Sequence, residues 1–183
     1  RGPATDEYVL RDAYLSGNVR AKLIQAKQSG LFGNVRALEE VQPEDVGAHE
    51  IVARVGSPWV PERVYEDFAK TLFGPGTGAY IRYTKMTAGY TVSLNPENGT
   101  ANTSTWGTSS YPGTEILNAL LNNRPIRVTY RDADDNLQTD KPATEAANIK
   151  AQDVRNKFQD WLFTDAERSE ILVRAYNDTN NNY

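Results

Sequence analysis

The spacing of apolar residues changes twice along this chain, and this restricts the possible folds more than any other feature. Apolar residues recur every three or four positions up to about residue 73, alternate with polar residues between about 80 and 130, and return to the longer spacing after residue 147. The longer spacing is typical of helices that bury one face, and the alternation is typical of strands. The sequence therefore predicts helical segments on both sides of a small sheet.

Residues 1–78 predict short helices that end at glycine or proline. The expected helices cover residues 6–15, 18–29, 34–42, 49–55 and 61–73. Asn18 and Asn34 are predicted N-caps, because an asparagine side chain accepts a hydrogen bond from a free amide of the first turn. The apolar stripe of the last helix consists of Val64, Tyr65, Phe68 and Leu72.

Residues 79–139 predict a central α+β unit, with a small, mostly antiparallel sheet and one crossing helix. The expected strands, rich in β-branched and aromatic residues, are 80–85, 89–94, 101–106 and 126–130. The first two form a hairpin, and the last leads into a turn over residues 132–136. Thr114 is the predicted N-cap of the crossing helix, residues 115–122.

Residues 140–183 predict helices again. The first has an apolar stripe at intervals of three and four: Ala147, Ala151, Val154, Phe158 and Trp161. Thr164 and Glu167 match a capping box, which predicts a break near Phe163 and a new helix through Tyr176. We expect the three segments, 1–78, 79–139 and 140–183, to form one compact α+β domain of a larger protein.

The composition excludes several kinds of chemistry. The chain has no cysteine and one histidine, so disulfides, cysteine-ligated zinc, iron–sulfur clusters and thiol nucleophiles are excluded, and we expect no metal site. No stretch approaches the roughly 20 apolar residues of a membrane-spanning helix, and we expect a cytoplasmic protein with no membrane partner.

A glycine-rich loop, Gly74-Pro75-Gly76-Thr77-Gly78, resembles the start of a phosphate-binding P-loop. Ala79 and Tyr80 stand where that motif requires a lysine and a serine or threonine. A helix also precedes the loop, whereas a P-loop follows a strand. We therefore expect a helix-to-strand turn and no nucleotide cofactor. Catalytic residues are expected in other parts of the parent protein that the family resemblance below implies, and none in this chain.

The centre of the chain is basic. The net charge of the whole chain is −4, but residues 79–131 carry five basic and two acidic residues. The basic residues are Arg82, Lys85, Arg124, Arg127 and Arg131, and Tyr83 and Trp106 are aromatic groups that can stack on bases. This combination favours contact with nucleic-acid phosphates. The alternative is that the aromatic residues belong to the core and the cations only keep the surface soluble.

Four strings carry a resemblance to a known family: YLSGNVRAKL (14–23), NVRALEEVQPED (34–45), IVARVGSPWVP (51–61) and FQDWLFTDAERSEILVRAYND (158–178). Together they resemble a region of very large proteins of phages, plasmids and other mobile elements. Those proteins join an adenine-specific DNA methylase module to a Swi/Snf-like helicase module, and phage relatives are linked to anti-restriction. The resemblance places this chain between the two modules. It implies that S-adenosylmethionine, ATP and magnesium are bound elsewhere in the parent protein.

The resemblance and the basic centre lead to one hypothesis and two alternatives. The hypothesis is a non-catalytic accessory domain whose central unit contacts DNA and whose helical ends contact the flanking methylase and helicase modules. The first alternative is a protein-interaction scaffold that docks these modules without contacting DNA. The second is a small hydrolase with a pair of carboxylates, which would require a cleft with two acids of perturbed pKa.

Overall fold

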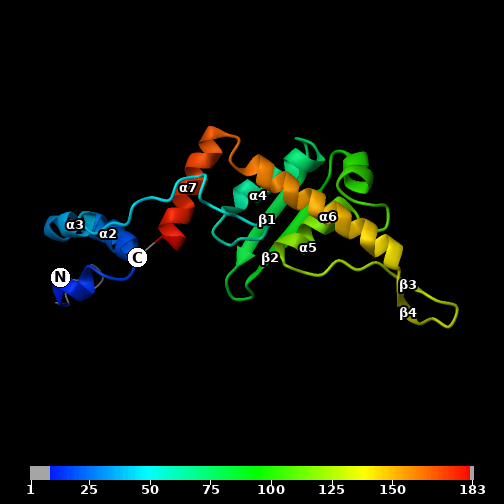
Figure 1. Cartoon of the computed structure of the whole chain (residues 1–183), viewed down its shortest axis with the longest axis horizontal. Coiled ribbons are helices and arrows are strands. Elements are labelled where there is room, and N and C mark those ends of the chain that lie inside the picture. Colours follow the sequence, from blue (N-terminus) through cyan, green and yellow to red (C-terminus); the bar gives the residue numbers. More distant parts are fainter. Residues whose placement is uncertain (1–8, 182–183) are drawn as a thin grey trace. The chain divides into compact units, whose positions relative to one another are not determined.

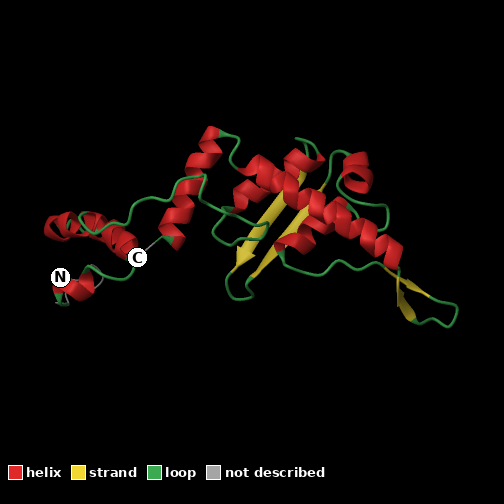
Figure 2. Ribbon diagram, viewed as in Figure 1, coloured by secondary structure: helices red, strands yellow, loops and turns green. Residues whose placement is uncertain are grey.

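The computed structural model describes residues 9–181 and has an α+β fold (Figure 2). The chain divides into two compact units. The first contains the described residues up to Ile51 and from Glu170 onward, and the second is Val52–Ser169. Helix α7 (Ala166–Asn180; red in Figure 1) begins in the second unit and ends in the first.

The first unit is helical. It contains α1 (Arg11–Tyr14), α2 (Val19–Gln28), α3 (Phe32–Glu39) and most of α7. Its small apolar cluster is centred on Tyr14, Val19, Ala26 and Leu38. The predicted cap of α2 is confirmed, because the Asn18 side chain accepts a hydrogen bond from the Ala21 amide at 2.9 Å.

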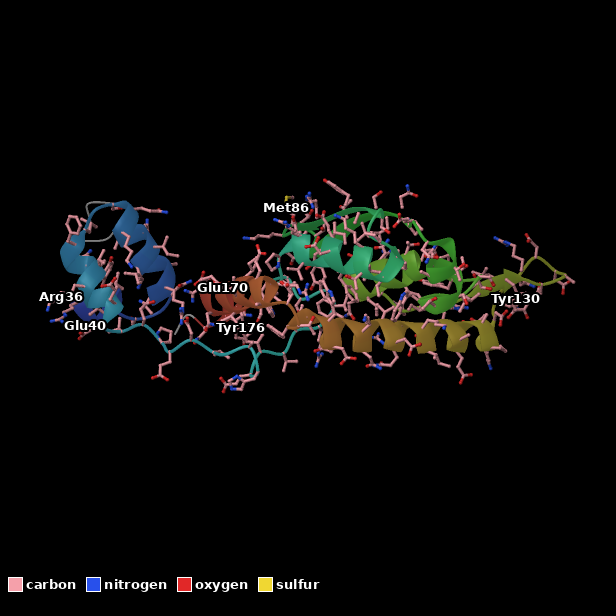
Figure 3. The ribbon with its side chains drawn as sticks, turned by 90° about the horizontal axis from the view of Figure 1, so that it is seen from above. Arg36, Glu40, Met86, Tyr130, Glu170 and Tyr176 are labelled. Atoms are coloured by element: carbon pink, nitrogen blue, oxygen red, sulfur yellow. The ribbon has the colours of Figure 1, made fainter. Side chains whose placement is uncertain are left out.

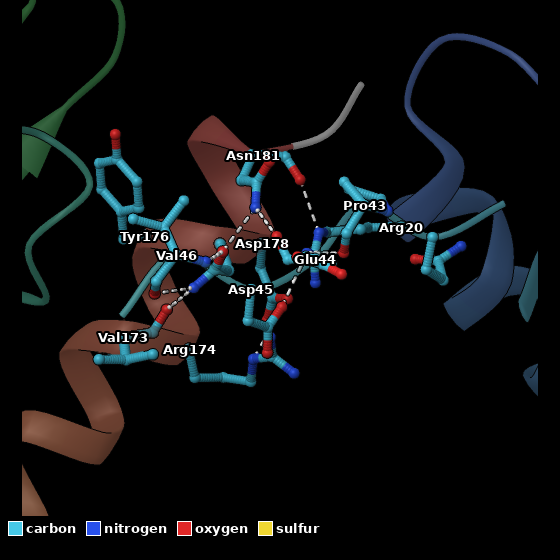
Figure 4. Close-up of polar contacts among 12 residues, drawn as sticks. Arg20, Pro43, Glu44, Asp45, Val46, Val173, Arg174, Tyr176, Asp178 and Asn181 are labelled. Atoms are coloured by element: carbon cyan, nitrogen blue, oxygen red, sulfur yellow. Dashed lines mark hydrogen bonds and ion pairs between the residues drawn. The ribbon is translucent and has the colours of Figure 1, made fainter. Parts of the chain in front are cut away.

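A buried arginine joins elements of this unit that are distant in sequence (Figure 4). Arg20 of α2 is 8% exposed; it donates to the carbonyl of Pro43 at 2.9 Å and forms an ion pair with Asp45 at 2.7 Å. Asp45 also pairs with Arg174 of α7 at 3.1 Å. The segment around Asp45 is thus held between α2 and α7.

The second unit is built on a β-hairpin, β1 (Gly78–Thr84) and β2 (Gly89–Asn95), with Ile81 opposite Val92 and Tyr83 opposite Tyr90. The predicted hairpin and its alternation are confirmed. Ile81 and Tyr90 face the core, whereas Thr91 and Ser93 are exposed.

Helices α4 (Glu62–Phe73), α5 (Gly113–Leu121) and α6 (Lys141–Leu162) supply the rest of the core (Figure 1). Phe158 of α6 lies between two aromatic residues of α4, with ring centroids 5.7 Å from Tyr65 and 5.0 Å from Phe68. The predicted stripe of α4 is buried, and so is that of α6 except for its last residue, the half-buried Trp161. Burying each large side chain of such a stripe stabilises the fold by about 2 kcal/mol of transfer free energy.

Three predicted elements differ in the structure, and part of a fourth lies outside the described residues. Residues 101–106 form no strand, because Ala101–Thr105 is a short π-helix. Residues 49–55 form a turn and an extended segment rather than a helix. Strand β3 (Thr129–Arg131) pairs with β4 (Leu137–Thr139) in a second sheet, separate from the β1–β2 sheet. Residues 6–8 of the first predicted helix lie outside the described residues.

Three predicted helix caps are also wrong. Helix α3 begins at Phe32, with Leu31 rather than Asn34 at the N-cap. Helix α5 begins after Pro112, so Thr114 lies inside it. At the start of α7 the Asp165 carboxylate accepts from the Arg168 amide at 2.8 Å, and Thr164 instead donates back to the carbonyl of Trp161. Because Asp and Thr are both good N-caps, their order in the sequence leaves the choice open.

Candidate nucleic-acid interface

The C-terminal end of α5 fixes the position of Arg124. Asn123 has a left-handed conformation with φ of +50°. Its amide donates to the carbonyl of Leu120 at 3.2 Å, and the Arg124 amide donates to that of Ala119 at 2.8 Å. These two bonds are the pattern of a Schellman motif, which ends a helix and sets the direction of the chain that follows. Arg124 is therefore held immediately after the helix, on a defined backbone.

The turn at residues 54–57 is held against the same end of α5. The hydroxyl of Tyr65 donates to the carbonyl of Ser57 at 3.0 Å and accepts from the Gly56 amide at 3.0 Å. Gly56 has φ of +94°, and a Cβ there would lie 2.7 Å from the carbonyl oxygen of Leu121. Only glycine allows this close approach. The approach places Arg54, the first residue of the turn, beside the end of α5.

Helix α6 supplies the third basic residue. Gln159 donates its side-chain amide to the carbonyl of Ala53, which fastens the segment carrying Arg54 to α6. Arg155 lies four positions earlier, on the same face of the helix as Gln159. Arg54, Arg124 and Arg155, contributed by three different elements, line one pocket of about 290 Å³. We call it the arginine pocket.

The arginine pocket has an uncompensated positive charge. Within residues 9–181, no carboxylate forms an ion pair with Arg54, Arg124 or Arg155. Arg124 donates to the side-chain oxygen of Asn118 at 2.8 Å, and Arg155 makes a long contact of 3.4 Å with Gln152. Because guanidinium groups stay charged at all physiological pH values, three of them around one pocket repel each other and attract an anion.

Two shallower hollows adjoin the pocket at Arg124. One, of about 420 Å³, is lined by Asn122 and by the end of the β1–β2 turn and the start of β2, from Thr87 to Thr91. The other, of about 330 Å³, is lined by Tyr111, Glu115 and Asn118. Burial and the nearby Glu115 raise the pKa of Tyr111 above its ordinary value. Arg124 thus lies at the junction of a polar surface that extends along both sides of α5.

The other sequence-predicted residues fall in three places. Arg82 on β1 is paired with Glu62 at 3.7 Å and with Glu66 at 2.5 Å, which balances its charge. Tyr83 is on the core-facing side of β1, with its ring 5.0 Å from that of Tyr90. Lys85 is exposed in the β1–β2 turn, one residue before Met86, which Figure 3 labels. The structure therefore brings Lys85 to the same turn that adjoins Arg124, while Arg82 and Tyr83 have structural partners.

Trp106 and the last two arginines lie apart from the arginine pocket. Trp106 is half-buried at the end of the π-helix. Arg127 donates to the Thr139 hydroxyl at 2.5 Å, and Arg131 pairs with Asp135 at 3.3 Å. Arg131 is the last residue of β3 in the exposed β3–β4 hairpin, on which Figure 3 labels Tyr130, and Arg127 lies two residues before β3. Neither arginine lines the pocket, and Asp135 balances the charge of Arg131.

The glycine-rich loop forms the predicted turn between α4 and β1. The Glu97 carboxylate accepts a hydrogen bond from the Gly76 amide at 2.8 Å, and a Cβ at Gly74 would lie 2.5 Å from the same carboxylate. The glycines therefore make room for Glu97. Because an acidic side chain fills this loop, the loop repels phosphate.

Two residues of the pocket were missed by the sequence reasoning. Arg54 lies in a segment predicted as helix, and Arg155 lies in a helix identified by its apolar face alone. Arg155 could have been identified from the polar face of its helix, because Gln152, Arg155 and Gln159 lie on that face with no acidic residue among them.

Within residues 9–181 no group of three or more histidine or acidic residues is arranged as a metal site. None of the helices described there has the length and apolar character needed to cross a membrane.

A family model described as "Domain of unknown function (DUF8437)" matches residues 54–182. The chain belongs to this family. The DUF8437 match includes every residue that lines the arginine pocket, from Arg54 to Gln159. No curated protein and no solved structure matches the chain.

Proposed function

We propose that this chain is a non-catalytic accessory domain that contacts DNA through phosphate groups. The observation that carries the proposal is the arginine pocket, in which Arg54, Arg124 and Arg155 meet without a carboxylate partner among the described residues. Arginine is suited to this role because its planar guanidinium binds phosphate oxygens through two parallel hydrogen bonds. Lys85 is exposed on the β1–β2 turn, whose residues Thr87 and Ala88 line the hollow beside Arg124.

The family resemblance of the four sequence strings places this domain in a larger setting. We propose that the parent is a cytoplasmic DNA methylase–helicase protein of a phage or other mobile element, with S-adenosylmethionine, ATP and magnesium bound by its other modules. In that setting the domain holds DNA between the two enzymatic modules. A weak, sequence-independent phosphate contact suits this task, because the parent must release and advance along the DNA.

The test is a binding titration with fluorescent single-stranded, duplex and forked DNA across a salt series. The double variant Arg124→Glu, Arg155→Glu is expected to bind each DNA at least about tenfold more weakly and to show a shallower salt dependence. The matched control is Arg63→Glu on α4, an exposed arginine outside the pocket. Equal binding by the double variant and the unaltered protein would contradict the role of the pocket.

A second candidate function, a scaffold that docks the flanking modules, is favoured by a different observation. Phe32 at the start of α3 is 84% exposed and Ile24 on α2 is 51% exposed. Exposed large apolar groups on one helical unit are typical of protein-docking surfaces. The scaffold predicts no DNA binding even at low salt, together with binding to the isolated helicase module that Phe32→Ser and Ile24→Ser weaken.

A further inference from the structure

The arginine pocket has more positive charge than one internal DNA phosphate requires. An internal phosphodiester carries a single negative charge, whereas a terminal phosphate monoester carries about 1.5 to 2 at neutral pH. The pocket has three guanidinium groups and no acidic lining residue. Charge matching therefore favours a dianionic phosphate over a link of the DNA backbone.

The rest of the lining suits the remainder of a terminal nucleotide. The side-chain amides of Asn123 and Gln159 can donate to sugar or base oxygens, and Val55, Ala119 and Leu120 provide an apolar wall. The volume of about 290 Å³ lies at the lower end of the range for small-ligand pockets. A pocket of this size suits one phosphate with its sugar rather than a run of nucleotides.

We propose that the arginine pocket binds the terminal phosphate monoester of a DNA strand. This inference rests on the proposed function, since it assumes that the domain contacts DNA. It makes a strand end the preferred occupant of the pocket, which binds internal phosphates more weakly. A free nucleotide or inorganic phosphate presents the same dianionic group, so the experiment must separate these sources.

The experiment compares one single-stranded oligonucleotide in three forms: with a 5′-phosphate, with a 3′-phosphate, and with hydroxyl groups at both ends. Affinity is measured by fluorescence anisotropy with the full chain, using a label at the centre of the strand. The strand with the preferred phosphorylated end is expected to bind about tenfold more tightly than the hydroxyl-ended strand. In Arg155→Gln this preference is expected to fall to about twofold or less, because the phosphorylated strand loses more affinity than the hydroxyl-ended strand. Arg63→Gln is the control and keeps the preference.

Each other result overturns the inference in a distinguishable way. Equal binding of all three strands refutes end recognition and leaves DNA contact standing, whereas no binding of any strand removes both proposals. A preference that survives in Arg155→Gln places the end-binding site outside the pocket. Competition separates the two sources of phosphate. If a mononucleotide or inorganic phosphate displaces the strand at concentrations equal to the strand's own dissociation constant, the ligand is the free phosphate compound.

Discussion

Asn177 on α7 is completely buried, yet both ends of its side-chain amide have partners. Its oxygen accepts from the Val46 amide at 2.8 Å, and its nitrogen donates to the carbonyls of Val46 at 3.0 Å and Val173 at 2.9 Å. The amide therefore pairs with Val46 as a neighbouring strand would. Both polar groups of Val46 depend on this one side chain, 131 positions away.

Replacing Asn177 by alanine removes the side-chain amide and leaves the backbone groups of Val46 and Val173 without this hydrogen-bond partner. We expect Asn177→Ala to lower the free energy of unfolding by about 1–3 kcal/mol, the cost of leaving buried polar groups without hydrogen bonds. Urea titration followed by circular dichroism measures the change. The control is Asn180→Ala, an exposed asparagine of the same helix, which is expected to stay within about 0.5 kcal/mol of the unaltered protein. Similar losses in both variants would contradict the role of the buried amide.

Two core tyrosines resist ionisation. Burial raises the pKa of Tyr90 to about 12, and it raises the pKa of Tyr65 above its ordinary value as well. Their rings meet edge to face, with centroids 5.6 Å apart, and both hydroxyls donate to the carbonyl of Ser57. Neither hydroxyl can lose its proton there without leaving a charge in the core.

The raised pKa of Tyr90 makes stability depend on alkaline pH. Below about pH 10 the tyrosine is protonated in both the folded and the unfolded chain, and its contribution is constant. Between about 10 and 12 the unfolded chain loses the proton and the folded chain keeps it, so the free energy of unfolding falls as pH rises. We expect Tyr90→Phe to lose less stability than the unaltered protein over this interval. Urea titrations at several pH values, with Tyr130→Phe on the exposed strand β3 as control, test this; parallel pH curves for Tyr90→Phe and the unaltered protein would contradict it.

At the scale of elements, side chains cover both open edges of the β1–β2 hairpin. Glu66 accepts from the Ile81 amide at 3.1 Å and Glu62 from the Tyr83 amide at 2.6 Å, along the outer edge of β1. On the outer edge of β2, the Asn122 side chain both accepts from the Tyr90 amide and donates to its carbonyl. An isolated two-stranded hairpin is marginally stable in water, and its open edges invite pairing with other chains. Here α4 and α5 supply the partners that further strands would otherwise provide.

The edge contact of Glu66 can be tested by one substitution. Glu66→Ala leaves the Ile81 amide without its acceptor and Arg82 without its nearest carboxylate. We expect the free energy of unfolding to fall by about 1–3 kcal/mol, because the Glu66 side chain is mostly buried. Glu145→Ala on α6, an exposed glutamate, is the matched control and is expected to have little effect. A loss no larger than that of the control would show that water replaces the carboxylate at this edge.

The elements that the sequence predicts well are those with a local signal. The α4 stripe and the alternation of β1 and β2 depend on which face is buried, and both are confirmed. The strand predicted for residues 101–106 was wrong. The threonines there favour strands, but a hydrogen bond from the Trp106 amide to the carbonyl of Ala101 closes a π-helical turn instead. The arginine pocket has no local signal, since its three arginines are up to 101 positions apart. Arg124 was identified by counting charges in the centre of the chain, whereas Arg54 and Arg155 can be assigned to the pocket only from the fold.

At the scale of the whole chain, the first unit is discontinuous. It combines the described residues up to Ile51 with those from Glu170 onward, and the second unit lies between them in the sequence. Polar contacts connect the two parts: Arg20 donates to the carbonyl of Asn181 at 2.6 Å, and Asp45 pairs with Arg174. Dividing the sequence into consecutive segments predicts the helices, but it cannot predict that the C-terminal residues pack with the N-terminal ones.

A chain that stops at Ser169 tests the dependence of the first unit on its C-terminal part. We expect the Val46 amide to exchange its hydrogen rapidly in this truncated chain, because its acceptor on Asn177 is gone. Amides of the second-unit core, such as that of Phe158, are expected to keep their protection, because Val52–Ser169 has its own core. Hydrogen–deuterium exchange measures both. Protection of Val46 that is unchanged in the truncated chain would contradict the prediction.

The discontinuity also sets an order of events during synthesis on the ribosome. Residues 52–169 are made between the two parts of the first unit. At about 5–20 residues per second, Asp45 and Val46 wait roughly 6–25 s before Arg174 and Asn177 emerge. At the end of that interval the second unit has all of its own residues, while the N-terminal helices still lack the side chains that complete their unit. Of the two units, the one whose synthesis begins first is therefore the last to be finished.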